Sequence, residues 1–473
     1  MTEVDAVVVG SGPNGLVAAV RLAEAGMRVV VLEAADRYGG GLRTEQLTLP
    51  GYHHDVCSSA HPLAQSSEAF RHLDLAREGL RFAQPSAPVG HPLTPGRSVM
   101  LWRDVERTAA YLGPDAALYR RVVGGLAARW RPVVDGVLDP FAVPPRSPVA
   151  TAAFGMAGLW GTSGVNRFAL RDEPARALLA GLAAHATLDL AQPLTTGVGL
   201  LLGVLGHAVG WPVAVGGSQS IADALVSRLT SLGGEVVTGH RVTDVDDLPS
   251  ARAVVLDLTP RQVVQVAGHR LPGVYVDRLS RWRYGSGAFK VDWALDGPVP
   301  WADPQLAEAG TLHLVGTGAE AIAAERAVAR GHLPARPYVL AVQPSVVDPT
   351  RAPAGKHTFW GYCHVPNSST VDMTDAIEAQ VERFAPGFRE RILARHVMGP
   401  AALEAHNANY VGGDIAGGAS DWRQLAARPV WSRCPWVTPN PRVFLSSSST
   451  PPGGGVHGMG GWHAAREVLR VHD

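Results

Sequence analysis

The stretch Val4–Gly15, VDAVVVGSGPNG, decides the fold of the first part of this chain. Its apolar run predicts a buried strand, and Gly10, Gly12 and Gly15 follow at the GxGxxG spacing that opens a helix. Gly10 permits a tight turn, Gly12 lets backbone amides approach a pyrophosphate, and Gly15 lets the helix pack close to the sheet. The stretch therefore predicts a dinucleotide-binding βαβ unit.

The second strand of this unit indicates which dinucleotide it binds. The apolar run Val29–Leu32 ends at Glu33, eighteen residues after Gly15. A carboxylate at that place accepts hydrogen bonds from both ribose hydroxyls and would repel a 2′-phosphate. FAD or NAD is therefore favoured over NADP, and we expect Pro13 and Asn14, at the positive helix N-terminus, to face the phosphates.

The residues that follow separate FAD from NAD. The chain continues as Glu33–Thr44, EAADRYGGGLRT. This stretch resembles the ExxxRxGGxxxT motif of the FAD-dependent amine-oxidase and phytoene-desaturase superfamily, whose glycines lie against the flavin nucleotide. The resemblance implies that further FAD contacts come from Ala34, Arg37, Gly40, Gly41, Leu42 and Arg43.

The other end of the chain carries a second flavin pattern. Residues 440–470 read as an apolar strand, a serine-rich turn, a glycine-rich loop and a final helix, Met459–Leu469. The helix N-terminus can direct its dipole at the N1/C2 edge of a flavin, which favours the anionic reduced ring. The pattern resembles the phytoene-desaturase-like branch of the superfamily, although Ser446–Pro451 replaces the more usual cysteine-glycine-serine approach. It implies contacts from Gly454, Gly455, Val456, Gly458 and Met459. Cys434 suggests the covalent flavin linkage of some amine oxidases, but its spacing to the final loop is short, so we expect noncovalent FAD.

The resemblance also implies a fold. We expect an α/β protein whose Rossmann-like FAD-binding domain, of the glutathione-reductase and amine-oxidase type, is assembled from residues 1–69, 206–268 and 425–473. A mixed α+β substrate domain takes residues 70–205, which read as largely helical, and 269–424. In the middle FAD segment we expect a helix at Ile221–Leu232, a strand pair at Glu235–Val237 and Arg241–Val245, and another strand from Ala253. The family places its adenine beside Val242, and the turn after the last strand adds Thr259 and Pro260.

A lysine is the main catalytic candidate. The stretch Gly285–Trp293, followed by Pro300 and Trp301, resembles the strand of amine oxidases whose lysine holds a water beside flavin N5. The resemblance implies that role for Lys290, where a positive charge could stabilise the reduced flavin or position water for oxygen chemistry. The alternative is a surface lysine on an alternating strand. His457, in the C-terminal glycine loop, is a second candidate, with a role in shaping the loop as its alternative.

Several other features bear on the substrate. Trp211, Tyr284 and Trp360 are candidates for an apolar substrate pocket, although such aromatics are more often core residues. The uncharged stretch Thr196–Ser218 contains several glycines and a proline, so we expect a buried element near the substrate cavity and not a membrane span. A peripheral membrane contact stays open. The stretch Thr311–Ala321 imitates a second nucleotide fingerprint, but no acidic residue ends a following strand, so we predict a strand and helix of the substrate domain.

Composition excludes other classes of protein. The 473 residues contain 42 basic and 42 acidic side chains without a basic run, so nucleic acid is not expected as a partner. Three cysteines form no CxxC motif and no signal peptide precedes the first strand, which indicates a cytoplasmic protein. The sequence His53-His54-Asp55 suggests metal ligands, but neighbours on a strand point to opposite faces, so we expect no metal site.

The resemblance implies an FAD-dependent dehydrogenase, desaturase or oxidase. It would take hydride from a C–H bond of a hydrophobic or amphipathic substrate, with oxygen or a quinone as the electron acceptor. A carotenoid-like polyene or a secondary-metabolite intermediate is the substrate that the family suggests, but fold-level analogy does not choose one. Two alternatives stay open: an amine or amino-acid oxidase that releases peroxide, and a non-enzymatic chaperone for prenylated proteins. The oligomeric state is not indicated.

Overall fold

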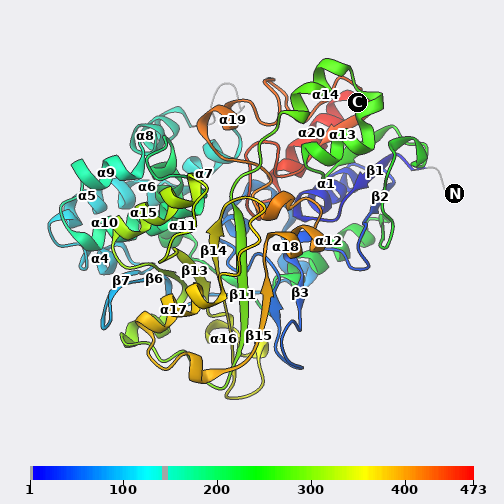
Figure 1. Ribbon diagram of the computed structural model, residues 1–473. Coiled ribbons are helices and arrows are strands. Elements are labelled where there is room, and N and C mark those ends of the chain that lie inside the picture. Colours follow the sequence, from blue (N-terminus) through cyan, green and yellow to red (C-terminus); the bar gives the residue numbers. More distant parts are fainter. Residues whose placement is uncertain (1–3, 141–146, 473) are drawn as a thin grey trace.

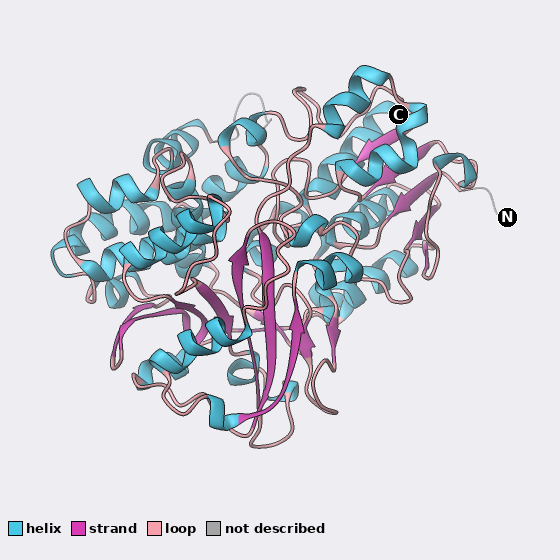
Figure 2. Cartoon of the chain, in the orientation of Figure 1, coloured by secondary structure: helices cyan, strands magenta, loops and turns pink. Residues whose placement is uncertain are grey.

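The computed structural model describes residues 4–140 and 147–472. Figure 1 shows two sheets with helices packed around them. Both termini lie beside the first sheet, and most of the helices from the first half of the chain gather at the opposite side of the molecule. Figure 2 shows the strands of the second sheet running between these helices and the helices that surround the first sheet.

The first sheet is parallel and draws its strands from three distant parts of the sequence. Its order is β16-β10-β1-β2-β9. All of its neighbouring strands pair in parallel. The strands are β1 (Ala6–Val9), β2 (Val29–Leu32), β9 (Glu235–Val237), β10 (Ala253–Leu256) and β16 (Val443–Leu445). The predicted assembly of a Rossmann-like sheet from separated segments is confirmed, while the domain boundaries themselves stay a prediction.

Helices cover both faces of the parallel sheet, which explains why its central strands are apolar throughout. Ala6 and Val8 pack toward one face, and Val7 and Val9 toward the other. The first face is covered by α1 (Pro13–Glu24), α12 (Gln219–Ser231) and α20 (Met459–His472). The second face is covered by α13 (Pro260–Ala267) and α14 (Gly273–Ser280).

One predicted strand of this region is wrong. Residues 241–245 form no strand, and Val245–Asp247 form a single 3-10 turn. The side chain of Asp244 accepts a hydrogen bond from the backbone N–H of Asp246 (2.8 Å), which favours a turn over a strand ladder. β9 is therefore the edge of the sheet, without a hairpin partner.

The second sheet is mixed and has seven strands in the order β15-β11-β14-β13-β12-β6-β7. β6 and β12 are parallel, and the other neighbours are antiparallel. The strands are β6 (Ala87–Thr94), β7 (Arg97–Leu101), β11 (Gly287–Leu295), β12 (Ala309–Leu314), β13 (Val339–Val342), β14 (His357–Val365) and β15 (Ile392–Met398). Two short pairs complete the strands: β3 (Thr44–Glu45) with β4 (His54–Asp55), and β5 (Phe82–Ala83) with β8 (Val213–Ala214).

Residues 70–205 are largely helical, as predicted, but they also contain the strands β6 and β7, which were not expected. β6 is buried along almost its whole length and so lacks the alternation that marks a half-exposed strand. It also contains Gly90 and Pro92, which are unfavourable in strands. A Cβ at Gly90 would lie 2.8 Å from the side chain of Leu306, so this glycine allows the 3-10 helix Pro304–Glu308 to approach the second sheet closely.

Helices cover both faces of the mixed sheet as well. One group follows β7: α4 (Val105–Ala109), α5 (Ala116–Tyr119), α6 (Gly125–Ala127), α7 (Trp130–Leu138), α8 (Pro148–Gly158), α9 (Thr162–Phe168), α10 (Glu173–Ala183) and α11 (Thr195–Ala208). Among the later helices are α15 (Gly318–Ala329), α16 (Pro344–Val347), α17 (Thr374–Phe384), α18 (Pro400–His406) and α19 (Trp422–Ala426). Two short helices, α2 (Pro62–Ser66) and α3 (Glu68–Leu73), lie in the N-terminal part of the chain.

The imitation nucleotide fingerprint lies in the mixed sheet, as predicted. Its strand is β12 and its helix is α15. The N-terminus of α15 is already bound by carboxylates, because Gly318 N–H donates to Glu173 (2.7 Å) and Thr317 and Glu320 form a capping box. These contacts use the amides that would bind a phosphate at a genuine fingerprint.

Candidate functional site

A cavity of about 1020 Å³ joins the parallel sheet to the mixed sheet. At one end it is lined by residues at the carboxyl ends of β1, β2 and β10, where open α/β sheets bind their ligands. At the other end it is lined by residues of α7, of the stretch 185–202, of Trp211 and of the strands β12, β13 and β14. We call these two ends the nucleotide end and the far chamber.

The glycine turn at the nucleotide end has the geometry that its spacing predicts. Gly10 has a φ of +100°, a conformation that favours glycine. Gly12 immediately precedes α1 and has no side chain that could cap that helix. A Cβ at Gly15 would overlap the carbonyl oxygen of Gly10, so only glycine allows α1 to pack this closely against the turn. The N-terminus of α1 is consequently open to a ligand in the cavity.

Glu33 is held in place at the end of β2. It is 8% exposed, and its carboxylate accepts hydrogen bonds from the backbone N–H groups of Ser11 (2.9 Å) and Ala35 (2.9 Å). One guanidinium nitrogen of Arg43 lies 3.7 Å away. The Ser11 hydroxyl also donates to this carboxylate (2.5 Å), and because each carboxylate oxygen can accept two hydrogen bonds, Glu33 can still receive a ribose hydroxyl.

Other groups at the nucleotide end need a polar partner. The side-chain oxygen of Asn14 and the Nε of Arg43 are buried and have no hydrogen-bond partner among the described residues. Both residues line the cavity. Since buried polar groups are normally hydrogen-bonded, a bound dinucleotide fits both groups: the Nε of Arg43 can donate to a phosphate, and the oxygen of Asn14 can accept from a hydroxyl or N–H group. Arg43 and the amides at the start of α1 would hold the diphosphate.

Sequence reasoning missed Asp257, which directly follows β10 at the same end of the cavity. Its carboxyl group accepts a hydrogen bond from Gly15 N–H (3.0 Å), and a Cβ at Gly12 would lie 2.7 Å from one of its oxygens. Burial raises the pKa of Asp257 to about 7; the negative charge of Glu33 also raises it, and the bond from Gly15 opposes both. A neutral Asp257 is compatible with phosphates at the N-terminus of α1.

This pKa predicts a pH-dependent stability. An unfolded Asp titrates near pH 4, so the native protein binds the additional proton between about pH 4 and 7. The associated stability is present below pH 4 and is lost as the pH rises through 7. We therefore expect Asp257→Asn to stabilise the cofactor-free protein at pH 8, by something on the order of 3 kcal/mol, and much less at pH 5. Urea unfolding at the two pH values measures this difference.

A fully exposed carboxylate provides the control for that measurement. The side chain of Asp375 is fully exposed, so Asp375→Asn should change stability equally, and little, at both pH values. Equal stabilities of the wild type and Asp257→Asn at pH 8 would show that the buried carboxyl group is not destabilising when ionised.

The C-terminal glycine loop lines the same cavity. Gly453, Gly454, Gly455, Val456 and His457 all line it. The loop leads into α20, which packs so closely on α1 that a Cβ at Gly461 would overlap the backbone oxygen of Asn14. The two ends of the chain therefore meet at one site.

The structure favours the loop-shaping alternative for His457. Its Nε2 lies 3.1 Å from the carbonyl oxygen of Gly453, and its Nδ1 accepts a hydrogen bond from Met459 N–H (3.0 Å). Burial lowers the pKa of His457 to about 4, so the ring is neutral at physiological pH. With both nitrogens bonded to its own loop, this histidine has no free position for proton transfer.

Lys290 lies beside the far chamber, one strand away from its wall. It is 3% exposed, and its ammonium group forms an ion pair with Asp292. The register of the sheet sets Lys290 opposite Tyr362 and Asp292 opposite Trp360, and both aromatic residues line the cavity. The Nζ lies 5.1 Å from the ring centroid of Trp360. Lys290 is thus a buried cation, not the surface lysine of the alternative, although it does not itself line the cavity.

The structure separates the predicted cofactor and substrate residues into two groups. Those that line the cavity are Gly10, Gly12, Pro13, Asn14, Glu33, Ala34, Gly40, Gly41, Arg43, Val242, Gly454, Gly455 and Val456, together with Trp211 and Trp360. Those outside its wall are Gly15, Arg37, Leu42, Thr259, Pro260, Gly458 and Met459. Tyr284 lines a separate pocket, and its hydroxyl oxygen accepts a hydrogen bond from Arg261 N–H (3.2 Å). The binding roles themselves stay predictions.

The predicted cofactor residues that do not line the cavity mostly support its wall from behind. Arg37 is exposed, and its guanidinium donates to the carbonyl oxygen of Thr44 (3.2 Å). Leu42 belongs to the core beneath the parallel sheet. Cys434, which is partly buried against the same core, does not line the cavity. Noncovalent binding of the flavin stays a prediction.

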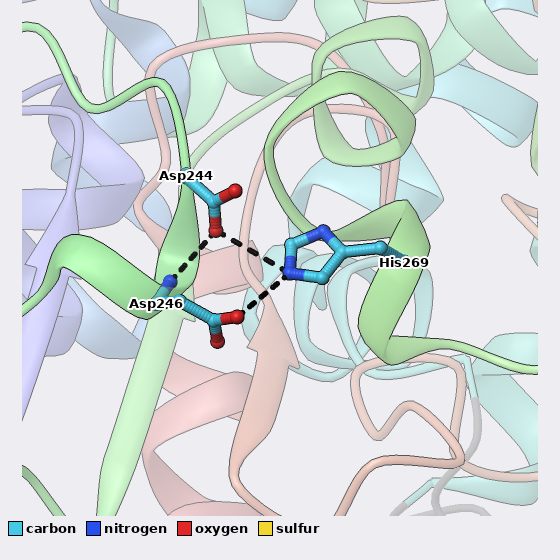
Figure 3. Close-up of side chains that lie close together, drawn as sticks. All are labelled: Asp244, Asp246 and His269. Atoms are coloured by element: carbon cyan, nitrogen blue, oxygen red, sulfur yellow. Dashed lines mark hydrogen bonds and ion pairs between the residues drawn. The ribbon is translucent and has the colours of Figure 1, made fainter.

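The described residues contain a single grouping with the spacing of metal ligands, and it lies outside the cavity wall. Figure 3 shows its members, Asp244, Asp246 and His269. The imidazole of His269 lies 3.3 Å from Asp244 and 3.1 Å from Asp246, and Arg270 forms an ion pair with Asp246 (2.6 Å). Asp246 therefore already has a cationic partner, Arg270, at the surface. His53, His54 and Asp55 do not form such a grouping in the described chain.

The stretch Thr196–Ser218 is buried beside the cavity, as predicted. It begins within α11, and Val198, Leu201 and Leu202 of that helix line the far chamber. No helix in the described residues is long and apolar enough to cross a membrane. Several large apolar side chains are nevertheless exposed on and around α8 and α9, namely Val149, Met156, Leu159, Trp160 and Phe168. A peripheral membrane contact stays a prediction.

Comparison with known proteins agrees with this architecture. Residues 8–76 match the NAD(P)-binding Rossmann-like domain. Over 99% of its length the chain is 27% identical to pyridine nucleotide-disulfide oxidoreductase domain-containing protein 2 of Rattus norvegicus, of which it covers 94%. It is also 26% identical to the phytoene desaturase (neurosporene-forming) of Rhodobacter capsulatus, over 95% of this chain and 91% of that protein.

The structure is similar to that of putrescine oxidase bound to putrescine, with a TM-score of 0.62, 16% sequence identity and 99% of each chain covered. This likeness shows the fold. The chain is a Rossmann-like dinucleotide-binding protein with the amine-oxidase fold, and its homologues include a phytoene desaturase. The resemblance recognised from the sequence is confirmed.

Proposed function

We propose that this protein is an FAD-dependent dehydrogenase or oxidase that acts on a neutral, largely apolar substrate. One observation carries the proposal: a single cavity connects a dinucleotide-binding turn to a far chamber without charged walls. When bound, FAD supplies the hydride acceptor for a C–H bond. The chain's own groups bind and orient the two ligands and exclude water.

Specific residues would hold FAD at the nucleotide end. Glu33 receives the ribose hydroxyls, Arg43 and the N-terminus of α1 receive the diphosphate, and the oxygen of Asn14 accepts a hydrogen bond from a hydroxyl or N–H group of the dinucleotide. Gly40, Gly41 and the loop Gly453–His457 line the same cavity, so their backbone would flank the flavin ring. Lys290 supplies a buried positive charge next to the far chamber.

The far chamber favours a neutral substrate over an amine. Its lining contains no Asp, Glu, Lys or Arg among the described residues. An alkylammonium ion would therefore leave water without a counter-charge, which is unfavourable in an apolar site. A flavin amine oxidase is the second candidate, because the fold is shared with putrescine oxidase. A dehydrogenase or desaturase acting on a hydrocarbon-rich molecule is supported by the homology to phytoene desaturase.

Optical spectroscopy tests the proposal in two steps. We expect the purified protein to be yellow, with the absorption bands of an oxidised flavin, or to become so when reconstituted with FAD. Under anaerobic conditions, neutral polyenes, ketones and secondary-metabolite intermediates should bleach these bands, whereas primary amines should not. Protein that stays colourless after reconstitution would refute the flavin, and bleaching by amines alone would favour the oxidase alternative.

A further inference from the structure

Three neighbouring strands form one wall of the far chamber. Thr311 of β12 pairs with Val342 of β13, and Val342 pairs with Trp360 of β14. Residues directly opposite one another in a sheet present their side chains on the same face, about 5 Å apart. Thr311, Val342 and Trp360 therefore form one row across the sheet, and all three line the cavity.

The two outer members of this row carry polar atoms without protein partners. The hydroxyl oxygen of Thr311 and the indole Nε1 of Trp360 have no hydrogen-bond partner among the described residues. The residues are only 1% and 3% exposed, respectively. An indole N–H can only donate, and a threonine hydroxyl can also donate. Such groups are rarely left unsatisfied in folded proteins, so an acceptor in the chamber is their natural partner.

A histidine pair adds a third polar group to the chamber. His185, which lines the cavity, has its Nε2 3.0 Å from the Nε2 of His313. Burial lowers the pKa of His185 to about 3 and places that of His313 well below its ordinary value, so both rings are neutral. One Nε2 must then donate to the other. The Nδ1 of His313 is buried and has no partner among the described residues.

The tautomers of this pair follow from the cost of an unsatisfied donor. If His185 donated, the Nδ1 of His313 would carry a proton with no acceptor, and buried N–H groups without a partner are rarer than unpaired acceptors. The favoured arrangement has His313 donating, which leaves the proton of His185 on its Nδ1. His185 then adds an N–H donor to those of Trp360 and Thr311.

We propose that the row Thr311–Val342–Trp360, together with His185, is a subsite that binds a neutral oxygen acceptor of the substrate, most simply a ketone or enone carbonyl. The inference rests on the proposed function in one respect: it assumes that the substrate binds in the far chamber. Three donors without an opposing carboxylate suit a group that accepts hydrogen bonds and carries no charge. An ammonium group would find one acceptor, the oxygen of Thr311, and no counter-charge, and a hydroxyl could place its own proton only on that oxygen, which a ketone does not require.

Three molecules of one shape can test the subsite: 4-tert-butylcyclohexanone, the corresponding alcohol and the corresponding amine. Isothermal titration calorimetry on the flavin-loaded protein at pH 8 measures their dissociation constants, with the amine protonated. We expect the ketone to bind about fivefold more tightly than the alcohol, which corresponds to one neutral hydrogen bond, and the amine to bind most weakly.

Variants separate hydrogen bonding from general packing. Trp360→Phe and Thr311→Val should each weaken ketone binding about fivefold and bring the ketone and alcohol closer in affinity. Trp211→Phe is the matched control, because Trp211 also lines the chamber but its Nε1 already donates to the carbonyl oxygen of Leu202 (3.3 Å). This control should leave the ketone-to-alcohol ratio unchanged.

Each other outcome overturns the subsite. The contradicting results are equal affinities for the three molecules, no detectable binding of the ketone, or tighter binding of the amine. An unchanged ketone-to-alcohol ratio in both Trp360→Phe and Thr311→Val is another. Each would show that the free donors are satisfied by water only. The absorption spectrum taken before each titration keeps the two proposals apart. A protein without flavin refutes the proposed function, whereas a yellow protein without a preference for the ketone refutes the subsite alone.

Discussion

Gly15→Ala is expected to produce a protein that retains no flavin and is less stable to heat. The added Cβ would overlap the carbonyl oxygen of Gly10 and come within 3.1 Å of the carboxyl group of Asp257. Neither backbone segment can yield without separating α1 from β1, and overpacking of this kind costs about 3 kcal/mol or more. The same displacement would move the amides that receive the diphosphate. Flavin absorbance per protein and thermal unfolding measure the two effects.

Two further glycine variants make this result interpretable. Gly155→Ala, on the exposed surface of α8, adds a methyl group with no atom within 4 Å and should keep both flavin and stability. Gly12→Ala is milder than Gly15→Ala, because its Cβ would meet only the side-chain oxygen of Asp257, at 2.7 Å. It should fold and bind flavin weakly. A folded Gly15→Ala protein with a full complement of flavin would contradict the role of this turn.

Lys290→Met is expected to slow reduction or reoxidation of the flavin by about a hundredfold or more, with FAD still bound. Methionine keeps most of the length of the side chain and removes the buried charge beside the far chamber. Stopped-flow absorbance measures the two half-reactions separately. Unchanged rates in both would remove Lys290 from the mechanism.

The charge of Asp292 has to be controlled in this experiment. Asp292 is fully buried, with His54 (3.6 Å) and His396 (3.8 Å) as its other neighbours, so loss of the lysine leaves a carboxylate without its main cation. Replacing Asp292 by asparagine in the same protein restores neutrality and should leave the half-reaction slow. Lys356→Met is the matched control, because this exposed lysine is the only other one in the chain and pairs with Asp296. It should react normally.

The parts of the fold that follow from local sequence were predictable. The apolar runs of β1, β2 and β10 and the glycines after β1 each occupy a few adjacent residues, and their physical consequences are local. β6 and β7 were not recognised as strands, because a strand buried on both faces has no alternation and Gly90 serves a contact with a residue far along the chain. The strand predicted at Arg241–Val245 is absent because the side chain of Asp244 caps the 3-10 turn Val245–Asp247 that follows it.

The candidate site shows the same division. Glu33 and the terminal glycine loops were recognised because their spacing along the chain reflects their positions around one ligand. Thr311, Val342 and Trp360 come from three strands, and only the register of the sheet brings them together. Asp257 was missed because a carboxylate after a strand commonly begins a turn or caps a helix, and its burial against Gly15 depends on the packing of β10 beside β1.

The order of strands in the parallel sheet has a consequence for biosynthesis. β10 pairs with β1 on one edge and with β16 on the other, and α20 packs against α1. The glycine turn before α1 is therefore synthesised more than four hundred residues ahead of β16, the glycine loop and α20. Such contacts between distant residues form late in folding. Cofactor capture then has to wait until this later segment has been made, and a chain cut before Val443 would expose the bare edge of β10 to other proteins.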